Sequence, residues 1–162
     1  YCGDLWIQGD YDRSVTFSAQ NDIVIEDDLT HSPGDDVMLG LIADRWIRVY
    51  HPANGSYPYE SCTNESGPGT ITIHAAMLAV KNSFTVDRYW CGNALGTLNV
   101  VGAIAQRYRG PVGTGSGGQA GTGYVKNYVY DDRLRFRSPP HFLDPVQASW
   151  KVQNQVEQVP AT

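Results

Sequence analysis

The sequence lacks any apolar run that approaches the ~18 residues needed to cross a membrane. Positive charge is also scarce, because 12 Lys and Arg residues face 17 Asp and Glu residues, for a net charge of −5. Non-specific binding to nucleic acid needs a basic face, so no nucleic-acid partner is expected. The chain begins with Tyr1 rather than Met, and we therefore expect a processed protein or a piece of a longer one.

Motifs for catalysis and cofactor binding are missing as well. The Gly-rich stretch 110–123 lacks the Lys-Ser/Thr ending of a phosphate-binding loop. The sequence has no Gly-x-Ser-x-Gly elbow, no Cys/His spacing of zinc type and no calcium-binding loop motif. We therefore expect no cofactor, no metal and no enzymatic activity.

What the sequence does contain is a short apolar repeat. Strand-like copies begin at Leu5, Ile23, Ile47, Ile71 and Leu98, so that the spacings are 18, 24, 24 and 27 residues. A second apolar string runs in phase with the first, at residues 17–19, 41–43, 77–79 and 103–105. Repeats of this length are typical of stacked units that cannot bury an apolar face alone. The prediction is an all-β fold, an irregular right-handed β-solenoid with long loops and a C-terminal extended strap.

The pattern divides the chain into three parts of one domain. Residues 1–109 form the solenoid coils, residues 110–123 a Gly-rich loop, and residues 124–162 an aromatic and basic strap that caps the coils. Loops 51–70 and 110–123 are expected to point outward. A helix over residues 74–81 is the competing interpretation of one strand, disfavoured by its β-branched neighbours.

The cysteines predict one disulfide bond. Cys62 precedes the strand at Ile71 by nine residues, and Cys91 precedes the strand at Leu98 by seven. In adjacent coils the two would lie about 4.8 Å apart along the stack, which suits a disulfide. That bond implies an oxidising, extracellular compartment, whereas the alternative is three buried free thiols. Cys2 is left without an assigned partner.

Paired carboxylates raise the alternative of a polysaccharide-cleaving enzyme. Asp10 and Asp28 occupy equivalent places in the first two copies, and glycosidic cleavage needs two carboxylates about 5–10 Å apart. The copies that begin at Ile71 and Leu98 have Ala76 and Ala103 at that place, so the row of carboxylates stops. For these residues, and for the Asp pairs at 27–28, 35–36 and 131–132, the favoured interpretation is a place in a turn or on a solvent-exposed face.

The histidines give no stronger indication of a site. His31 shares a loop with Asp35 and Asp36, which could hold a hard cation, but ordinary solvated loop residues are the favoured interpretation. The remaining histidines are scattered, and His74 is expected to be a satisfied strand residue.

Tyrosines and arginines gather in the strap and in two loops. We single out as a candidate interaction surface Tyr57, Tyr59, Tyr108, Tyr128, Tyr130, Arg133 and Arg135. Pairing of the arginines with the many Asp residues of the body is the favoured alternative, and stacking on glycans is a further one.

Three stretches, 96–113, 121–134 and 138–142, resemble the C-terminal region of bacterial PilX-like pilus assembly or minor pilin-associated proteins. The resemblance extends from about residue 3 to about residue 150 and includes no catalytic motif. It implies a β-rich surface domain that would follow a prepilin leader and an apolar helix, of which this chain would be the C-terminal piece.

Together these observations predict a non-enzymatic structural or adhesive component of a bacterial extracellular appendage, similar to a type IV pilus. Its partners would be other subunits of the appendage, with glycans as a further candidate and no membrane contact by this segment. The alternatives are a secreted solenoid that binds or cleaves polysaccharide, and a self-polymerising solenoid scaffold.

Overall fold

The computed structural model describes residues 3–34, 36–55, 62–65 and 69–142, and in these ranges the chain is all-β, as predicted. The single helical element described is a short 3₁₀ turn, η1 (Asp132–Arg135). The strands run in chain order as β1 (Leu5–Asp10), β2 (Val15–Ala19), β3 (Ile23–Thr30), β4 (Leu39–Ala43), β5 (Ile47–Val49), β6 (Ala53–Asn54), β7 (Thr63–Asn64), β8 (Ile71–Ala79), β9 (Phe84–Val86), β10 (Ala94–Gln106), β11 (Gly113–Ser116) and β12 (Gln119–Tyr130).

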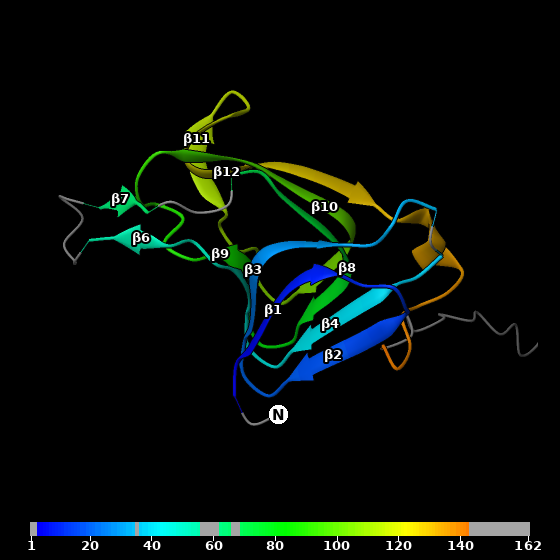
Figure 1. Cartoon of the computed structure of the whole chain (residues 1–162). Helices are drawn as coiled ribbons and strands as arrows, with labels where there is room; N and C mark the ends of the chain where they lie inside the picture. Colours follow the sequence, from blue (N-terminus) through cyan, green and yellow to red (C-terminus); the bar gives the residue numbers. More distant parts are fainter. Residues whose placement is uncertain (1–2, 35, 56–61, 66–68, 143–162) are drawn as a thin grey trace, which may run out of the picture.

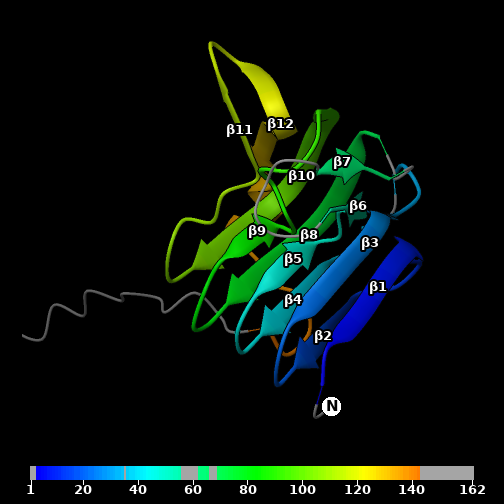
Figure 2. The same cartoon turned by 90° about the vertical axis from the view of Figure 1, so that its left-hand side faces the viewer.

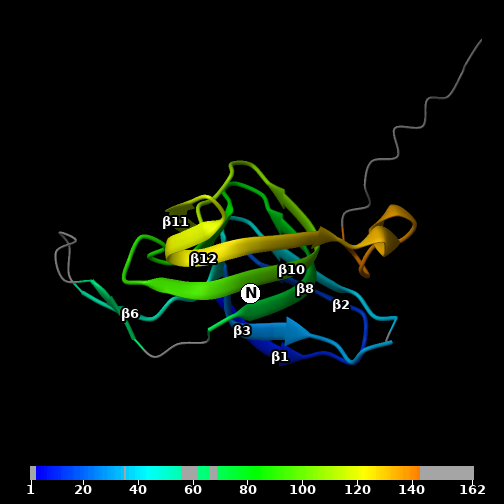
Figure 3. The same cartoon turned by 90° about the horizontal axis from the view of Figure 1, so that it is seen from above.

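Ten of these strands form one sheet that curls into a nearly closed, barrel-like shape (Figure 1). Every pairing in this sheet is parallel except the β11–β12 hairpin. Figure 2 shows the strands rising side by side from β1 and β2 at one end to β10 and β12 at the other. The β6–β7 hairpin stands apart from the sheet, as the view from above makes clear (Figure 3).

The apolar repeat found in the sequence sets the pairing of the first strands. Leu5 pairs with Ile23, and Ile23 in turn pairs with Ile47, so the first three copies stack in direct register. Ile71 and Leu98, which begin two further copies, also pair directly. Parallel strands in register place like side chains one above another, and this arrangement builds a continuous apolar layer.

The third and fourth copies, however, do not pair with each other. β5 pairs with β9, which places Ile47 beside Phe84, and the repeat pattern did not include β9. β8 instead meets the far end of β3, where Leu29 pairs with Ile73. The helix considered for residues 74–81 is wrong, because most of that range lies in β8.

The second apolar string forms a second stack of parallel strands. Phe17 pairs with Leu41, and Leu41 pairs with Met77, as the sequence phase predicts. Met77 then pairs with Ile104 rather than with Ala103, one residue beyond the expected partner. The longer, partly buried side chain of Ile104 therefore continues the apolar row.

The core lies inside the curled sheet, where the two stacks face each other. Its largest fully buried side chains are Phe84, Ile23, Ile25, Leu39, Leu41, Ile47, Ile71, Ile73, Met77, Leu98 and Val49. Replacing one of the large members by alanine would lower the free energy of unfolding by about 2–5 kcal/mol, because the shortened side chain leaves a cavity that the surrounding sheet cannot fill.

A charged cluster ties four strands together on the outside of the sheet. Arg48 on β5 donates to Asp22 at 3.0 Å and to both carboxylate oxygens of Asp87 at 2.7 and 2.8 Å. Its third nitrogen lies 3.8 Å from Asp4, at the start of β1. Burial acts against the charged guanidinium, but Asp87 and Asp22 outweigh it and raise the pKa of Arg48. The cluster thus fixes the same register that the apolar rows select.

The predicted disulfide is present. Cys62 and Cys91 are bonded, and their Cα atoms lie 5.4 Å apart. The bond attaches the β6–β7 hairpin to the loop that leads into β10. Cys2 lies outside the described residues. In the described ranges, no helix has the length and apolar character to span a bilayer.

Removing the disulfide should lower the stability of the fold. The bond closes a loop with a sequence separation of 29 residues, and the loop-entropy model gives about 3–4 kcal/mol for a closure of that size. We expect this loss in the Cys62→Ser, Cys91→Ser double variant, measured by urea unfolding with the same slope as the unchanged protein. A loss of less than about 1 kcal/mol would contradict the tethering role.

Candidate functional site

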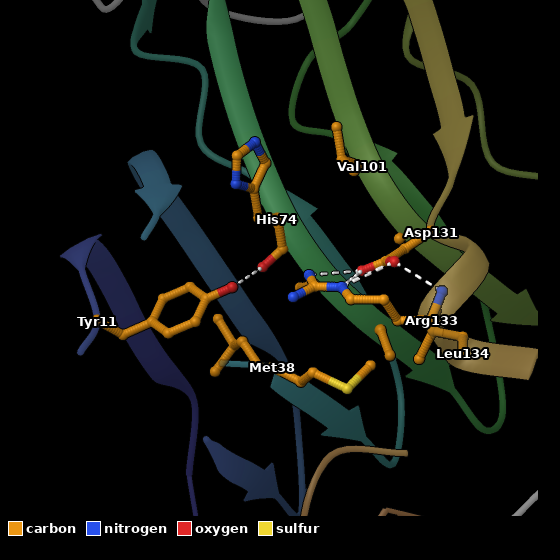
Figure 4. Close-up of a pocket in the computed structure, with 11 residues that line it drawn as sticks. Tyr11, Met38, His74, Val101, Asp131, Arg133 and Leu134 are labelled. Carbon is orange, nitrogen blue, oxygen red and sulfur yellow. Dashed lines mark hydrogen bonds and ion pairs between the residues drawn. The ribbon is translucent and has the colours of Figure 1, made fainter. Parts of the chain in front are cut away.

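A small, partly open cavity lies between β8, β10 and the segment around η1 (Figure 4). The side chains that approach it include Tyr11, Met38, His74, Asp131 and Arg133. Its volume is about 10 Å³, which is close to the room that one water molecule needs. The cavity therefore cannot enclose an organic substrate.

Gly102 forms part of the wall of this cavity. A Cβ atom at this position would overlap the carbonyl oxygen of Ala75 on the neighbouring strand, and the residue has a φ of 155°. Glycine allows β8 and β10 to approach closely at this point.

The Tyr11 hydroxyl closes one side of the cavity. It donates a hydrogen bond of 2.8 Å to the carbonyl oxygen of His74. Burial raises the pKa of Tyr11 to about 12, with nearby Arg133 opposing and Asp131 adding to the shift. Tyr11 therefore remains a protonated donor that links the loop after β1 to β8.

Arg133 and Asp131 form a tightly bonded pair on the other side. The Arg133 guanidinium donates to Asp131 through Nε at 3.0 Å and through Nη2 at 2.7 Å. These bonds lower the pKa of the Asp131 carboxyl and raise the pKa of Arg133, in both cases against the effect of burial. Both groups stay charged at neutral pH, and the lowered basicity of the Asp131 carboxylate, together with its bonds to Arg133, makes it a weak general base.

His74 is the remaining titratable group at the cavity. Its ring centroid lies 5.0 Å from that of His31, and its Nδ1 atom is buried without a hydrogen-bond partner among the described residues. Burial lowers the pKa of His74, helped by His31 and Arg133 and opposed by Asp131 and Asp28.

The carboxylates that suggested polysaccharide cleavage are bonded within the fold. Asp10 accepts a hydrogen bond from the hydroxyl of Thr30, and Asp28 accepts one of 2.6 Å from the backbone amide of Thr72. Among the described residues, no three His, Cys, Asp or Glu side chains lie close enough to hold a metal ion. Asp35, part of the candidate cation loop, is outside those residues.

The predicted interaction residues divide between several places. Tyr128 and Tyr130 lie on β12, half exposed, and Arg135 stacks over the Tyr130 ring at 6.0 Å. Tyr108 is 58% exposed and lies under Arg107. Tyr57 and Tyr59 lie outside the described residues.

Two arginines of the tail instead bind the body of the protein. Arg133 faces the cavity and reaches Asp36, and Arg137 also pairs with Asp36. Beside them, a Cβ atom added to Gly40 on β4 would meet the rings of Pro139 and Phe142, so the tail packs closely on that strand. These contacts are the tail-to-body pairing that the sequence analysis favoured.

A further surface, which the sequence pattern did not indicate, lies at the end of the sheet formed by β1 and β2. β1 pairs only with β3, and β2 only with β4, so each has one edge with no strand beside it in the described part of the chain. Between these strands lies a hollow of about 310 Å³, whose apolar lining includes Ile7, Val15 and Phe17. Phe17 is 39% exposed although it occupies a core position of the repeat. We call this surface the open end.

No protein-family model, curated protein or solved structure matches this chain.

The lowered pKa of His74 predicts an acid-sensitive stability. The unfolded chain, with a His pKa near 6.5, binds more protons than the folded one once the pH falls through that value. The free energy of unfolding should therefore decrease from pH 7 downward and level off below the lowered pKa of the folded state. Urea unfolding at a series of pH values should show a smaller decrease for His74→Gln, and an equal decrease would contradict this assignment.

Proposed function

We propose that this chain is a right-handed β-solenoid domain, and a non-enzymatic structural or adhesive component of a bacterial extracellular appendage of the type IV pilus kind. In this proposal the open end is the contact with a neighbouring subunit. The observation that best supports this contact is that core positions of the first two strands, Phe17 above all, stay partly exposed beside two unpaired strand edges.

Physical chemistry supports a partner at this end. Strand edges without neighbours present unpaired N–H and C=O groups, which are a template for pairing with another chain. An apolar hollow of about 310 Å³ beside these edges adds area whose burial is favourable, roughly 25 cal/mol for each Å². A second subunit could supply both the hydrogen bonds and the apolar contacts.

The enzymatic alternative has less support. Asp10, Asp28 and Asp131 are all engaged in hydrogen bonds that hold strands or turns together. The small cavity beside His74 has room for about one water molecule. These observations favour structural roles for the same carboxylates that suggested a glycosidase.

The extracellular location and the pilus assignment rest on other arguments. The Cys62–Cys91 disulfide favours an oxidising compartment and counts against a cytosolic scaffold. The link to a pilus-like appendage comes from the resemblance of residues 96–142 to pilus-associated proteins.

The proposal predicts that a charge at the open end prevents assembly. Phe17→Asp should weaken self-association by at least roughly tenfold, because a carboxylate cannot be buried in an apolar contact without a partner. Sedimentation velocity over a wide concentration range measures this effect. Val129→Asp is the matched control, since Val129 is 53% exposed but lies on β12, at the opposite end of the strand order from β1 and β2.

A result in which Phe17→Asp assembles like the unchanged protein would contradict the proposal. So would an unchanged protein that stays monomeric at every concentration, because the open end would then have no partner among copies of this chain.

A further inference from the structure

A second surface, separate from the open end, has the composition of a ligand site. It is a groove of about 540 Å³ between the outward face of β1 and β5 and the β6–β7 hairpin, within the size range of small-molecule sites. Its lining includes Trp6, Tyr50, Glu65 and Arg88, and it shares no residue with the lining of the open end.

Trp6 provides an aromatic platform on one wall. It pairs in register with Val24, which in turn pairs with Arg48, so the three side chains share the outward face of the sheet. Its ring meets Tyr50 edge to face, with centroids 5.5 Å apart and planes at 67°. Its register partner Val24 is fully buried, whereas half of the surface of Trp6 stays exposed. A tryptophan held in this way offers a fixed apolar face to a ligand.

The charges of the groove favour an uncharged ligand. The Arg48 guanidinium is already bonded to Asp22 and Asp87. Arg88 donates one hydrogen bond to the carbonyl oxygen of Ala53, and exposed Glu65 has no side-chain partner among the described residues. In the lining itself two guanidinium groups, of Arg48 and Arg88, balance two carboxylates, of Asp87 and Glu65. Asp22 and Asp4, which also face Arg48, add negative charge nearby that disfavours an anion. Glu65 offers an acceptor and Arg88 offers spare donors.

We propose that this groove binds a neutral saccharide. The apolar face of a sugar ring would lie against Trp6, its hydroxyl groups would donate to the Glu65 carboxylate, and other hydroxyl oxygens would accept from Arg88. An anionic sugar would meet the unpaired charge of Glu65 and is therefore disfavoured. A saccharide site would give the domain an adhesive surface, but the inference does not depend on assembly through the open end.

The disulfide holds the second wall of this groove in place. Ala53 and Glu65 belong to the β6–β7 hairpin or its edge, and Cys62 attaches that hairpin to Cys91. Asn64 adds two contacts, one of 3.2 Å to the ring of His51 and one of 3.0 Å to a backbone carbonyl. Reduction of the disulfide should therefore weaken saccharide binding, whereas binding that involved Trp6 alone would not change.

The test uses the neutral tetrasaccharides of cellulose, amylose and chitin, with trigalacturonate as the anionic comparison. Each is titrated into the full chain, and binding is measured by isothermal titration calorimetry, a readout that the Trp6→Ala variant retains. We expect at least one neutral oligosaccharide to bind saturably, and Trp6→Ala and Glu65→Gln each to weaken that binding by roughly tenfold or more. Tyr108→Ala, which removes another exposed aromatic ring, should leave it unchanged.

Several results would overturn the proposal. These are no saturable binding of any neutral oligosaccharide, tighter binding of trigalacturonate, or full binding by Trp6→Ala. Glu65→Gln separates a loss of binding from a loss of folding, because Glu65 is exposed and its replacement should leave the unfolding midpoint unchanged. Failure of saccharide binding with normal self-association would reject this site alone.

Discussion

The whole structure depends on apolar side chains that stack in register between parallel strands. Leu5, Ile23, Ile47 and Phe84 form one such row, with successive members paired across β1, β3, β5 and β9. A shift of one residue in any of these pairings would turn the buried face outward. The Arg48 cluster spans the same strands on the outer face, so packing inside and charge pairing outside specify one register.

A stack of this kind must be completed at both ends, and the two ends differ. At the far end, the Val86 amide and the Thr85 hydroxyl of β9 donate hydrogen bonds to the carbonyl oxygen of Pro111, and Val112 is buried in the same core. Tyr128 on β12 packs edge to face on Phe84, with ring centroids 6.3 Å apart. At the near end, β1 and β2 have no comparable cover in the described part of the chain. Because of this asymmetry, the open end is the end of the stack at which a neighbouring subunit could add a strand.

The sequence predicted the elements that follow from periodicity. The repeats at Leu5, Ile23 and Ile47 pair as their phase requires, and the Cys62–Cys91 bond follows from the same stacking. The repeat pattern did not predict β9, because its three residues, Phe84 to Val86, are too few to show a period. The sequence therefore predicted the wrong partner for β5, which pairs with β9.

The candidate sites were much harder to predict, since they join residues with no common spacing. The groove beside Trp6 combines a strand residue with Glu65 from a hairpin and Arg88 from a turn. Arg133 was assigned to an interaction surface, but it lies at the small cavity because Asp131 and Asp36 bind it there. The exposure of Phe17 depends on which strands have neighbours, and a single repeat pattern does not contain that information.

Hydrogen–deuterium exchange at low and high protein concentration tests the central claim most directly. If the open end is the subunit contact, the edge amides of β1 and β2 exchange rapidly in the dilute protein and become protected as the concentration rises. Amides of β8, which has strands on both sides, should be protected under both conditions. Protection that rises elsewhere while β1 and β2 still exchange rapidly would contradict the account.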